Sequence, residues 1–197
     1  MKNKAVFIDR DGVINPEIYN PDTGMYEAPK EIRDFAIYPR VLKSLLMLRD
    51  EGYNLFIISN QPDYAKGKAK LEDIEAIGRL LWEFSDDNGG LFEDCFYCYH
   101  HPEGTVPEYA IKCKCRKPGT LFIEQAVSRY DLDAKRCFMV GDRDTDVLCG
   151  YKSGFSTVRI DSPRVRRIPS LCVPDAIAED IYEAAIMIID LSKSSEE

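Results

Sequence analysis

The sequence predicts a three-layer α/β/α sandwich with a Rossmann-like parallel sheet, in a single domain spanning residues 1–197. Two observations predict this fold class. Short apolar runs rich in β-branched and aromatic residues alternate with amphipathic stretches of helical period, the order typical of parallel sheets with helices on both faces. Several runs also open directly into polar, carboxylate-bearing tips, and open α/β sheets bind ligands at the carboxyl ends of their strands.

The composition is that of an ordinary globular protein, with 45% apolar and 30% charged residues. The net charge of −8 argues against a general affinity for nucleic acid or anionic membranes. No apolar run reaches the roughly 18 residues of a membrane span, and the N-terminal run is too short for a signal peptide. We therefore expect a cytoplasmic protein with no nucleic-acid or membrane partner. Its seven cysteines are then thiols or metal ligands rather than disulfides.

The first strand is expected over Ala5–Ile8, because its apolar residues are typical of a buried parallel strand. A polar loop, Pro16–Lys30, follows with turn chemistry at Asn20-Pro21-Asp22. Since it leaves the carboxyl end of the strand, this loop can lie over a site there. Apolar residues between positions 41 and 48 then recur with helical period, and this helix ends at Glu51-Gly52.

The remaining elements follow from the same criteria. Apolar runs predict further strands at Tyr53–Ile58, Asp94–Tyr99, Cys137–Val140 and Phe155–Ile160. Helical spacing predicts helices at Leu71–Phe84, Leu121–Tyr130, Asp144–Ser153 and Glu179–Leu191. The segment Ser162–Ser170 is expected to be a basic loop, and about residues 192–197 a flexible tail.

Two carboxylates, Asp9 and Asp11, follow the first strand two residues apart. On extended backbone such residues point the same way, and Gly12 then lets the chain turn sharply. Two like charges in one small volume repel unless a cation holds them, which suggests a hard, oxygen-binding metal such as Mg²⁺. The alternative is a turn that uses Asp and Gly for shape alone.

Polar groups mark three further points of the predicted sheet edge. They are Ser59-Asn60, Arg116-Lys117, and Asp142 with Asp144 and Asp146 beyond it. Each has a plain interpretation as a cap or turn; Asp144, for example, could simply cap the helix that it precedes. Together they supply a nucleophilic carboxylate, a hydroxyl, an amide, a cation and further carboxylates. This set is typical of phosphoryl transfer, where catalysis is mostly positioning and charge neutralisation.

At these residues the chain resembles the haloacid dehalogenase-like (HAD) superfamily of aspartate-nucleophile phosphatases. The family's four motifs occur in order as Asp9-Arg10-Asp11-Gly12, Ser59-Asn60-Gln61, Lys117-Pro118, and Gly141-Asp142-Arg143-Asp144-Thr145-Asp146. One Asp-x-Asp pair is a weak signal, but four ordered motifs over residues 5–160 are a strong one.

The resemblance implies a role for each carboxylate. Asp9 would attack phosphorus and form an aspartyl phosphate, while Asp11 would protonate the leaving oxygen and then activate water. Mg²⁺ would lie between the Asp9 carboxylate, the Asp11 main-chain carbonyl and Asp142. Asp146 would orient Lys117 or a metal-bound water. The residues that would hold the transferring oxygens are Ser59, Asn60 and Lys117. Aspartate at the second motif position favours phosphate chemistry over dehalogenation.

A cysteine- and histidine-bearing loop, at about residues 98–117, predicts a second metal site. Two pairs of ligands frame it, and four protein ligands with no open position are typical of structural zinc. Cys95 and His101 compete for membership, but strand alternation puts Cys95 on the opposite face. The ligands chosen are Cys98, His100, Cys113 and Cys115. Unliganded buried thiols are the alternative interpretation. The other cysteines (Cys95, Cys137, Cys149 and Cys172) are expected to be small apolar core residues.

This loop, Cys-x-His-His-Pro followed by Cys-x-Cys-Arg-Lys-Pro, resembles two small, cap-less groups within the superfamily. They are the D-glycero-D-manno-heptose 1,7-bisphosphate 7-phosphatases and the histidinol-phosphate phosphatases. The resemblance implies a hydrolase of carbohydrate metabolism, acting in lipopolysaccharide or other surface-polysaccharide biosynthesis. The expected absence of a cap domain suggests a monomer. Arg116 beside Lys117 is placed to meet a second phosphate, which favours a sugar bisphosphate as substrate.

The chain departs from the heptose enzymes in two places. Residues 61–67 differ from their usual Ser-Gly-Ile-Ala-Arg-Gly-like run, and Gly119-Thr120 replaces a longer Pro-Gly-Met turn. Three alternatives therefore stay open: a histidinol-phosphate phosphatase, a nucleic-acid 3′-end phosphatase, and a zinc-stabilised module without catalysis.

Overall fold

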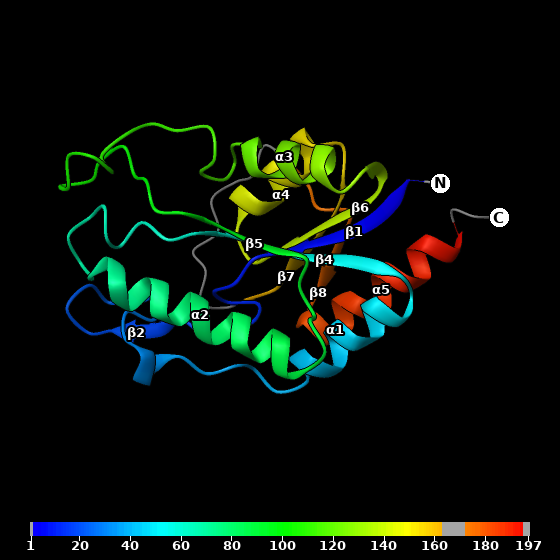
Figure 1. The fold of residues 1–197 in the computed structure, drawn as a ribbon, viewed down its shortest axis with the longest axis horizontal. Coiled ribbons are helices and arrows are strands. Elements are labelled where there is room, and N and C mark those ends of the chain that lie inside the picture. The colour runs from blue at the N-terminus through cyan, green and yellow to red at the C-terminus, as the bar shows by residue number, and fades with distance from the viewer. Residues whose placement is uncertain (1, 163–171, 195–197) are drawn as a thin grey trace.

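The computed structural model describes residues 2–162 and 172–194 (Figure 1). In chain order its strands are β1 (Asn3–Ile8), β2 (Ile18–Asn20), β3 (Met25–Glu27), β4 (Tyr53–Asn60), β5 (Asp94–Cys98), β6 (Leu132–Gly141), β7 (Ser156–Ile160) and β8 (Ala176–Ala178). Its α-helices are α1 (Val41–Asp50), α2 (Leu71–Asp87), α3 (Leu121–Arg129), α4 (Asp144–Lys152) and α5 (Ile181–Ser194), with a short 3₁₀ turn at Ile32–Asp34.

Six strands form one parallel sheet in the order β5-β4-β1-β6-β7-β8. β1 lies inside it, and Ile8 is the register partner of both Ile57 and Val140. The residues that follow β1, β4 and β6 therefore emerge side by side at one edge of the sheet. This register brings the first, second and fourth sequence motifs together.

Helices cover both faces of the sheet, with α1, α2 and α5 on one side and α3 and α4 on the other (Figure 1). Successive residues of β1 alternate between the two cores: Val6 and Ile8 pack with α1 and α5, and Phe7 packs with α3. The ring of Phe7 stacks on that of Phe56 with centroids 4.7 Å apart. The predicted three-layer α/β/α fold is confirmed.

The predicted loop at Pro16–Lys30 is wrong in part, because it contains an antiparallel hairpin of β2 and β3. Its turn falls at the Asn-Pro-Asp-Thr-Gly run, as the turn residues indicate. The rings of Tyr19 and Tyr26 meet across the hairpin at 5.4 Å. Strands of three residues are too short for their alternation to be recognised. In the part of the chain that the structure describes there is no cap domain. This hairpin and the loop after β5 are the segments that lie beside the site at the sheet edge.

Several boundaries also differ from the predicted ones, and the sheet has one additional strand. β6 begins at Leu132 rather than Cys137, the strand β8 had not been predicted, and α5 continues to Ser194, so the predicted tail is partly helical. Of the predicted basic loop at Ser162–Ser170, residues 163–170 lie outside the described residues. Among the helices that are described, none has the length and hydropathy needed to span a membrane.

Candidate active site

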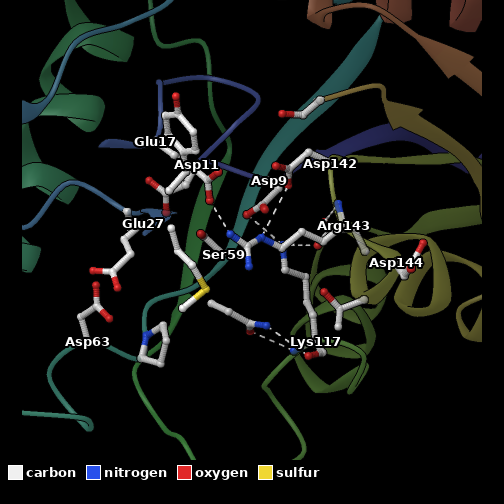
Figure 2. A pocket seen from close by; sticks show the side chains of 18 of the residues that line it. Asp9, Asp11, Glu17, Glu27, Ser59, Asp63, Lys117, Asp142, Arg143 and Asp144 are labelled. Atoms are coloured by element: carbon white, nitrogen blue, oxygen red, sulfur yellow. Dashed lines mark hydrogen bonds and ion pairs between the residues drawn. The ribbon is translucent and has the colours of Figure 1, made fainter. Parts of the chain in front are cut away.

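The predicted catalytic and phosphate-binding residues line one cavity of about 450 Å³ at the carboxyl-terminal edge of the sheet. They are Asp9, Asp11, Ser59, Asn60, Arg116, Lys117, Asp142 and Asp146. Figure 2 shows the side chains of Asp9, Asp11, Ser59, Lys117 and Asp142 gathered around it. Residues separated by more than 130 positions in the sequence thus share one pocket.

The ammonium group of Lys117 is buried and lies at the centre of these contacts. Its Nζ is 2.9 Å from Asp9 Oδ1, 2.7 Å from Asp146 Oδ1 and 2.7 Å from the carbonyl oxygen of Ile58. Burial alone would lower the pKa of Lys117, but the carboxylates of Asp146 and Asp9 raise it above its ordinary value. The lysine therefore remains a cation inside the protein.

Lys117 does not directly follow a strand but lies near the end of the long loop between β5 and α3. Asn60 fixes the main chain there, because its Oδ1 accepts a hydrogen bond from the Lys117 amide at 2.9 Å and its Nδ2 donates to the Lys117 carbonyl at 3.1 Å. The Asn60 side chain thus positions the lysine. Ser59, one residue earlier, lines the cavity, and its Oγ accepts a hydrogen bond from Gln61 Nε2 at 3.0 Å.

Three buried carboxylates, those of Asp9, Asp142 and Asp146, have oxygens within 4.8 Å of one another. Neither oxygen of Asp142 has a hydrogen-bond partner among the described residues. Gly12 makes room for this group: a Cβ there would lie 2.3 Å from Asp142 Oδ2, and its φ of +84° suits glycine. A buried carboxylate without a donor is costly, so this donor set fits a hard divalent cation.

The same crowding shifts the pKa values of two of these groups. Burial raises the pKa of Asp9 to about 6, although Lys117 partly opposes the shift. Burial, with the nearby charges of Asp9 and Asp146, raises the pKa of Asp142 to about 9. Without a cation, Asp9 and Asp142 therefore keep their protons to a higher pH in the folded protein than in the unfolded chain.

The carboxylate of Asp11 has a separate set of partners. Its Oδ1 accepts hydrogen bonds from Arg10 Nη2 and from Asn15 Nδ2, both at 3.0 Å, and its Oδ2 accepts one from Gln61 Nε2. Arg10 is fully buried. Arg10 and Gln61 belong to the first and second sequence motifs, which by themselves predict no contact with Asp11, and Asn15 lies outside the motifs. The sequence feature that could have predicted this contact is an arginine between two aspartates at the end of a buried strand.

The hairpin of β2 and β3 forms a wall of the cavity with Met25, Tyr26 and Glu27, which sequence analysis also missed. Glu27 ties this wall to the loop after β4, since Lys68 Nζ lies 2.9 Å from its Oε1. Burial would raise the pKa of Glu27, but hydrogen bonds from Lys30, Asn20 and Lys68 lower it to about 2.

Two further ion pairs involve residues that line the cavity. Arg143 pairs with Glu17, and Arg159 Nη1 lies 3.6 Å from Asp144 Oδ1. Asp144, which sequence analysis read as a possible helix cap, instead bears a charge facing the pocket. Pairings over such sequence separations leave no local pattern that could have predicted them.

A second cluster of ligand types comprises Cys98, His100, Cys113 and Cys115, the four predicted ligands. Their sulfur atoms lie 3.2–3.5 Å apart, and His100 Nδ1 is 3.5 Å from Cys115 Sγ. A tetrahedral zinc site has ligand–ligand distances of about 3.7 Å, so these side chains could hold such an ion. The group does not include Cys95 or His101.

Comparison with known proteins places these features in a family. A family model described as HAD-hydrolase-like matches residues 114–184. A D-glycero-D-manno-heptose-1,7-bisphosphate 7-phosphatase of Chlorobaculum tepidum is 31% identical over 191 residues, covering 92% of each chain. The chain belongs to the HAD phosphatases. A second relative, a D-glycero-alpha-D-manno-heptose-1,7-bisphosphate 7-phosphatase of Photorhabdus laumondii, is 35% identical. The match covers 78% of the present chain and 79% of the relative.

The fold of this HAD phosphatase also matches a solved structure. The D,D-heptose 1,7-bisphosphate phosphatase of B. bronchiseptica, complexed with magnesium and phosphate, superposes with a TM-score of 0.75 at 22% identity. The match covers 96% of this chain and 99% of the other. At this identity the likeness supports the fold alone. Separately, phosphatases of the HAD family use Mg²⁺.

The raised pKa values predict how the stability of the metal-free HAD phosphatase depends on pH. Between an ordinary aspartate pKa of 3.8 and the folded values of about 6 and 9, the folded state binds more protons than the unfolded state. Stability should therefore fall as pH rises through this window. We expect the Tm in chelator to decrease from about pH 5 to about pH 9, and Asp142→Asn to flatten the upper part of the decrease. A Tm that rises over this window in the wild type would contradict the assignment.

Proposed function

We propose that this HAD phosphatase removes one phosphate from a small sugar bisphosphate, of the D-glycero-D-manno-heptose 1,7-bisphosphate type, by way of an aspartyl phosphate on Asp9. The observation that carries the proposal is the contact of Asp9 with the buried Lys117 ammonium at the floor of a cavity lined by further cations. The similarity to two heptose bisphosphate 7-phosphatases over most of the chain supports the substrate class.

In the first step, a carboxylate oxygen of Asp9 attacks phosphorus while the ester P–O bond breaks, and Asp11 gives a proton to the leaving sugar oxygen. In the second step, water attacks the aspartyl phosphate and Asp11 takes its proton. The bond between Asp9 and phosphorus breaks, and inorganic phosphate leaves. Lys117 and Ser59 line the place where the transferring oxygens would lie, so they are suited to hold them.

Mg²⁺ would be held by the carboxylates of Asp9 and Asp142 and by the main-chain carbonyl of Asp11. The orphaned oxygens of Asp142 support this assignment. Asp146 lies within the same carboxylate group, and it also binds Lys117 and accepts a hydrogen bond from the Arg143 amide. We therefore assign it a positioning role. When bound, the metal neutralises charge that would otherwise repel a phosphate dianion.

A structural zinc ion would be held by Cys98, His100, Cys113 and Cys115. The loop that carries these ligands also carries two cations of the cavity, Arg116 and Lys117. The Arg116 amide donates to Cys113 Sγ at 3.4 Å, and Arg116 Nη1 donates to the His100 carbonyl at 3.4 Å. Zinc would thus fix the position of Arg116 and of its neighbour Lys117.

A second phosphate would have a place near Arg116 and Lys66, which both line the cavity. Burial lowers the pKa of Lys66, and the nearby charge of Arg116 lowers it further. Two cations that repel each other beside a cavity are stabilised when an anion binds between them. Lys66 would therefore supply the positive charge that the arginine of the Ser-Gly-Ile-Ala-Arg-Gly-like run supplies in the heptose enzymes.

Asp9→Asn is the direct test of the nucleophile. We expect this variant to fold, since the side chain keeps its shape, and to lose phosphate release by a factor of at least about 10³, because an amide cannot form the aspartyl phosphate. Phosphate release from heptose 1,7-bisphosphate with Mg²⁺ is the measurement, and Asp22→Asn, outside the cavity, is the control. Normal turnover by Asp9→Asn would refute the mechanism.

Removal of zinc should lower both stability and activity, because ligation in such sites contributes to folding. With a zinc-selective chelator, or in Cys113→Ser, we expect a lower Tm and faster proteolysis within residues 98–117. Cys95→Ala changes a thiol outside the cluster and should keep its zinc. If proteolysis in this loop were the same with and without metal, the structural role would be wrong.

Arg116→Ala should separate substrates with one and two phosphates. Loss of a charge-assisted hydrogen bond should lower kcat/KM for heptose 1,7-bisphosphate about 10- to 100-fold. Heptose 7-phosphate and histidinol phosphate should change less than about threefold, since they lack the second phosphate. The matched control is Arg33→Ala, an exposed arginine outside the cavity. Equal losses on all three substrates would contradict the bisphosphate assignment, and a wild type that prefers histidinol phosphate would replace it.

A further inference from the structure

Arg10, between the two motif aspartates, has no exposed surface and is among the largest fully buried side chains of the described residues. Arginine is seldom fully buried, because its charge must be compensated inside the protein. The compensating group is the carboxylate of its neighbour Asp11. Arg10 Nη2 lies 3.0 Å from Asp11 Oδ1 and 3.2 Å from Oδ2, and Arg10 Nε lies 3.1 Å from Oδ1.

The two oxygens of Asp11 differ in their surroundings. Oδ1 accepts three hydrogen bonds, two from Arg10 and one from Asn15 Nδ2. Oδ2 lies beside Gln61, whose Nε2 also donates to the hydroxyl of Ser59, a residue of the cavity wall. Arg10 Nη2 thus reaches both oxygens of Asp11, and Gln61 links the second oxygen to Ser59 of the cavity wall.

Arg10 is itself held in place from two sides. Its guanidinium carbon lies 5.8 Å from the centre of the Tyr97 ring on β5, a cation–π distance, and its main-chain amide donates to Asp9 Oδ1 at 2.8 Å. Its Nη1 has no hydrogen-bond partner among the residues described. Replacing a buried ion pair by apolar side chains often leaves stability unchanged or improves it, so stability alone does not account for this charge.

We propose that Arg10 is a positioning residue for catalysis: by binding both oxygens of Asp11 it fixes the orientation of this cavity-lining carboxylate toward the oxygen that leaves phosphorus. The proposal rests on the proposed function, in which Asp11 gives its proton to that oxygen. Arg10 is not among the residues that line the cavity, and the lining residue that its side chain binds is Asp11. Removal of Arg10 should therefore affect most the substrates whose leaving group needs a proton.

The test compares kcat/KM for a sugar phosphate, which leaves as an alkoxide, with that for p-nitrophenyl phosphate, whose leaving group needs little protonation. This constant includes the steps up to departure of the leaving group. We expect Arg10→Met to lower kcat/KM about 10²-fold or more for the sugar phosphate and less than about threefold for the aryl ester. Asp11→Asn should give the same pattern. Arg10→Lys keeps the charge but not the paired donors, so it should lie between Arg10→Met and the wild type.

A double variant and a stability control complete the design. Arg10→Met with Asp11→Asn should be no worse on the sugar phosphate than Asp11→Asn alone, because both changes remove the same function. Leu81→Ala, a core change outside this network, should lower the Tm without altering the ratio between substrates. If Arg10→Met does not fold, Arg10→Lys carries the comparison.

Equal losses of an Arg10 variant on both substrates, or losses that multiply in the double variant, would overturn the inference and leave a structural role. Failure of the proposed function is a distinct result. In that case the wild type would release no phosphate, or Asp9→Asn would remain active.

Discussion

The buried ammonium group of Lys117 is the interaction on which the site depends. It joins the end of β1 through Asp9, the end of β4 through the Ile58 carbonyl and the start of α4 through Asp146. Removal of one partner from a buried ion pair typically costs about 3–5 kcal/mol, because the remaining charge is left without compensation. The three carboxylates share one closely bound cation, Lys117, and Asp142 accepts no hydrogen bond from the residues that the structure describes. This surplus of negative charge prepares the pocket for a metal ion, and the metal and lysine together prepare it for phosphate.

The rest of the fold serves to hold this network. The register of β1 against β4 and β6 sets three chain segments at one edge, and Gly12 lets Asp142 approach where any Cβ would collide. The fourth segment arrives through the zinc-type loop, which has little apolar content with which to order itself. A zinc ion bound by its Cys and His cluster would supply that order, and the same loop carries Arg116 and Lys117. The hairpin of β2 and β3 closes the cavity and is tethered through Glu27.

Much of this could be predicted from the sequence, because the signals were local. The carboxylates of Asp9 and Asp142 end recognisable strands, and the spacing of Cys98 and Cys113 is typical of a metal loop. The remainder depends on tertiary contacts. Asp11 lies beyond the end of β1, where the chain turns. The alternation of side chains along a strand therefore could not predict that its carboxylate contacts Arg10. Likewise, nothing local links Glu17 to Arg143, and β2, β3 and β8 are too short to show a period.

The most direct measurement of the central claim is a crystal structure of the protein with Mg²⁺ and beryllium fluoride, which mimics a phosphoryl group on a carboxylate. The account predicts the beryllium on an oxygen of Asp9, within reach of Lys117 and Ser59, with magnesium between Asp9 and Asp142. Beryllium fluoride bound to another residue, or an Asp9 that stays paired with Lys117 and unmodified under saturating conditions, would contradict it.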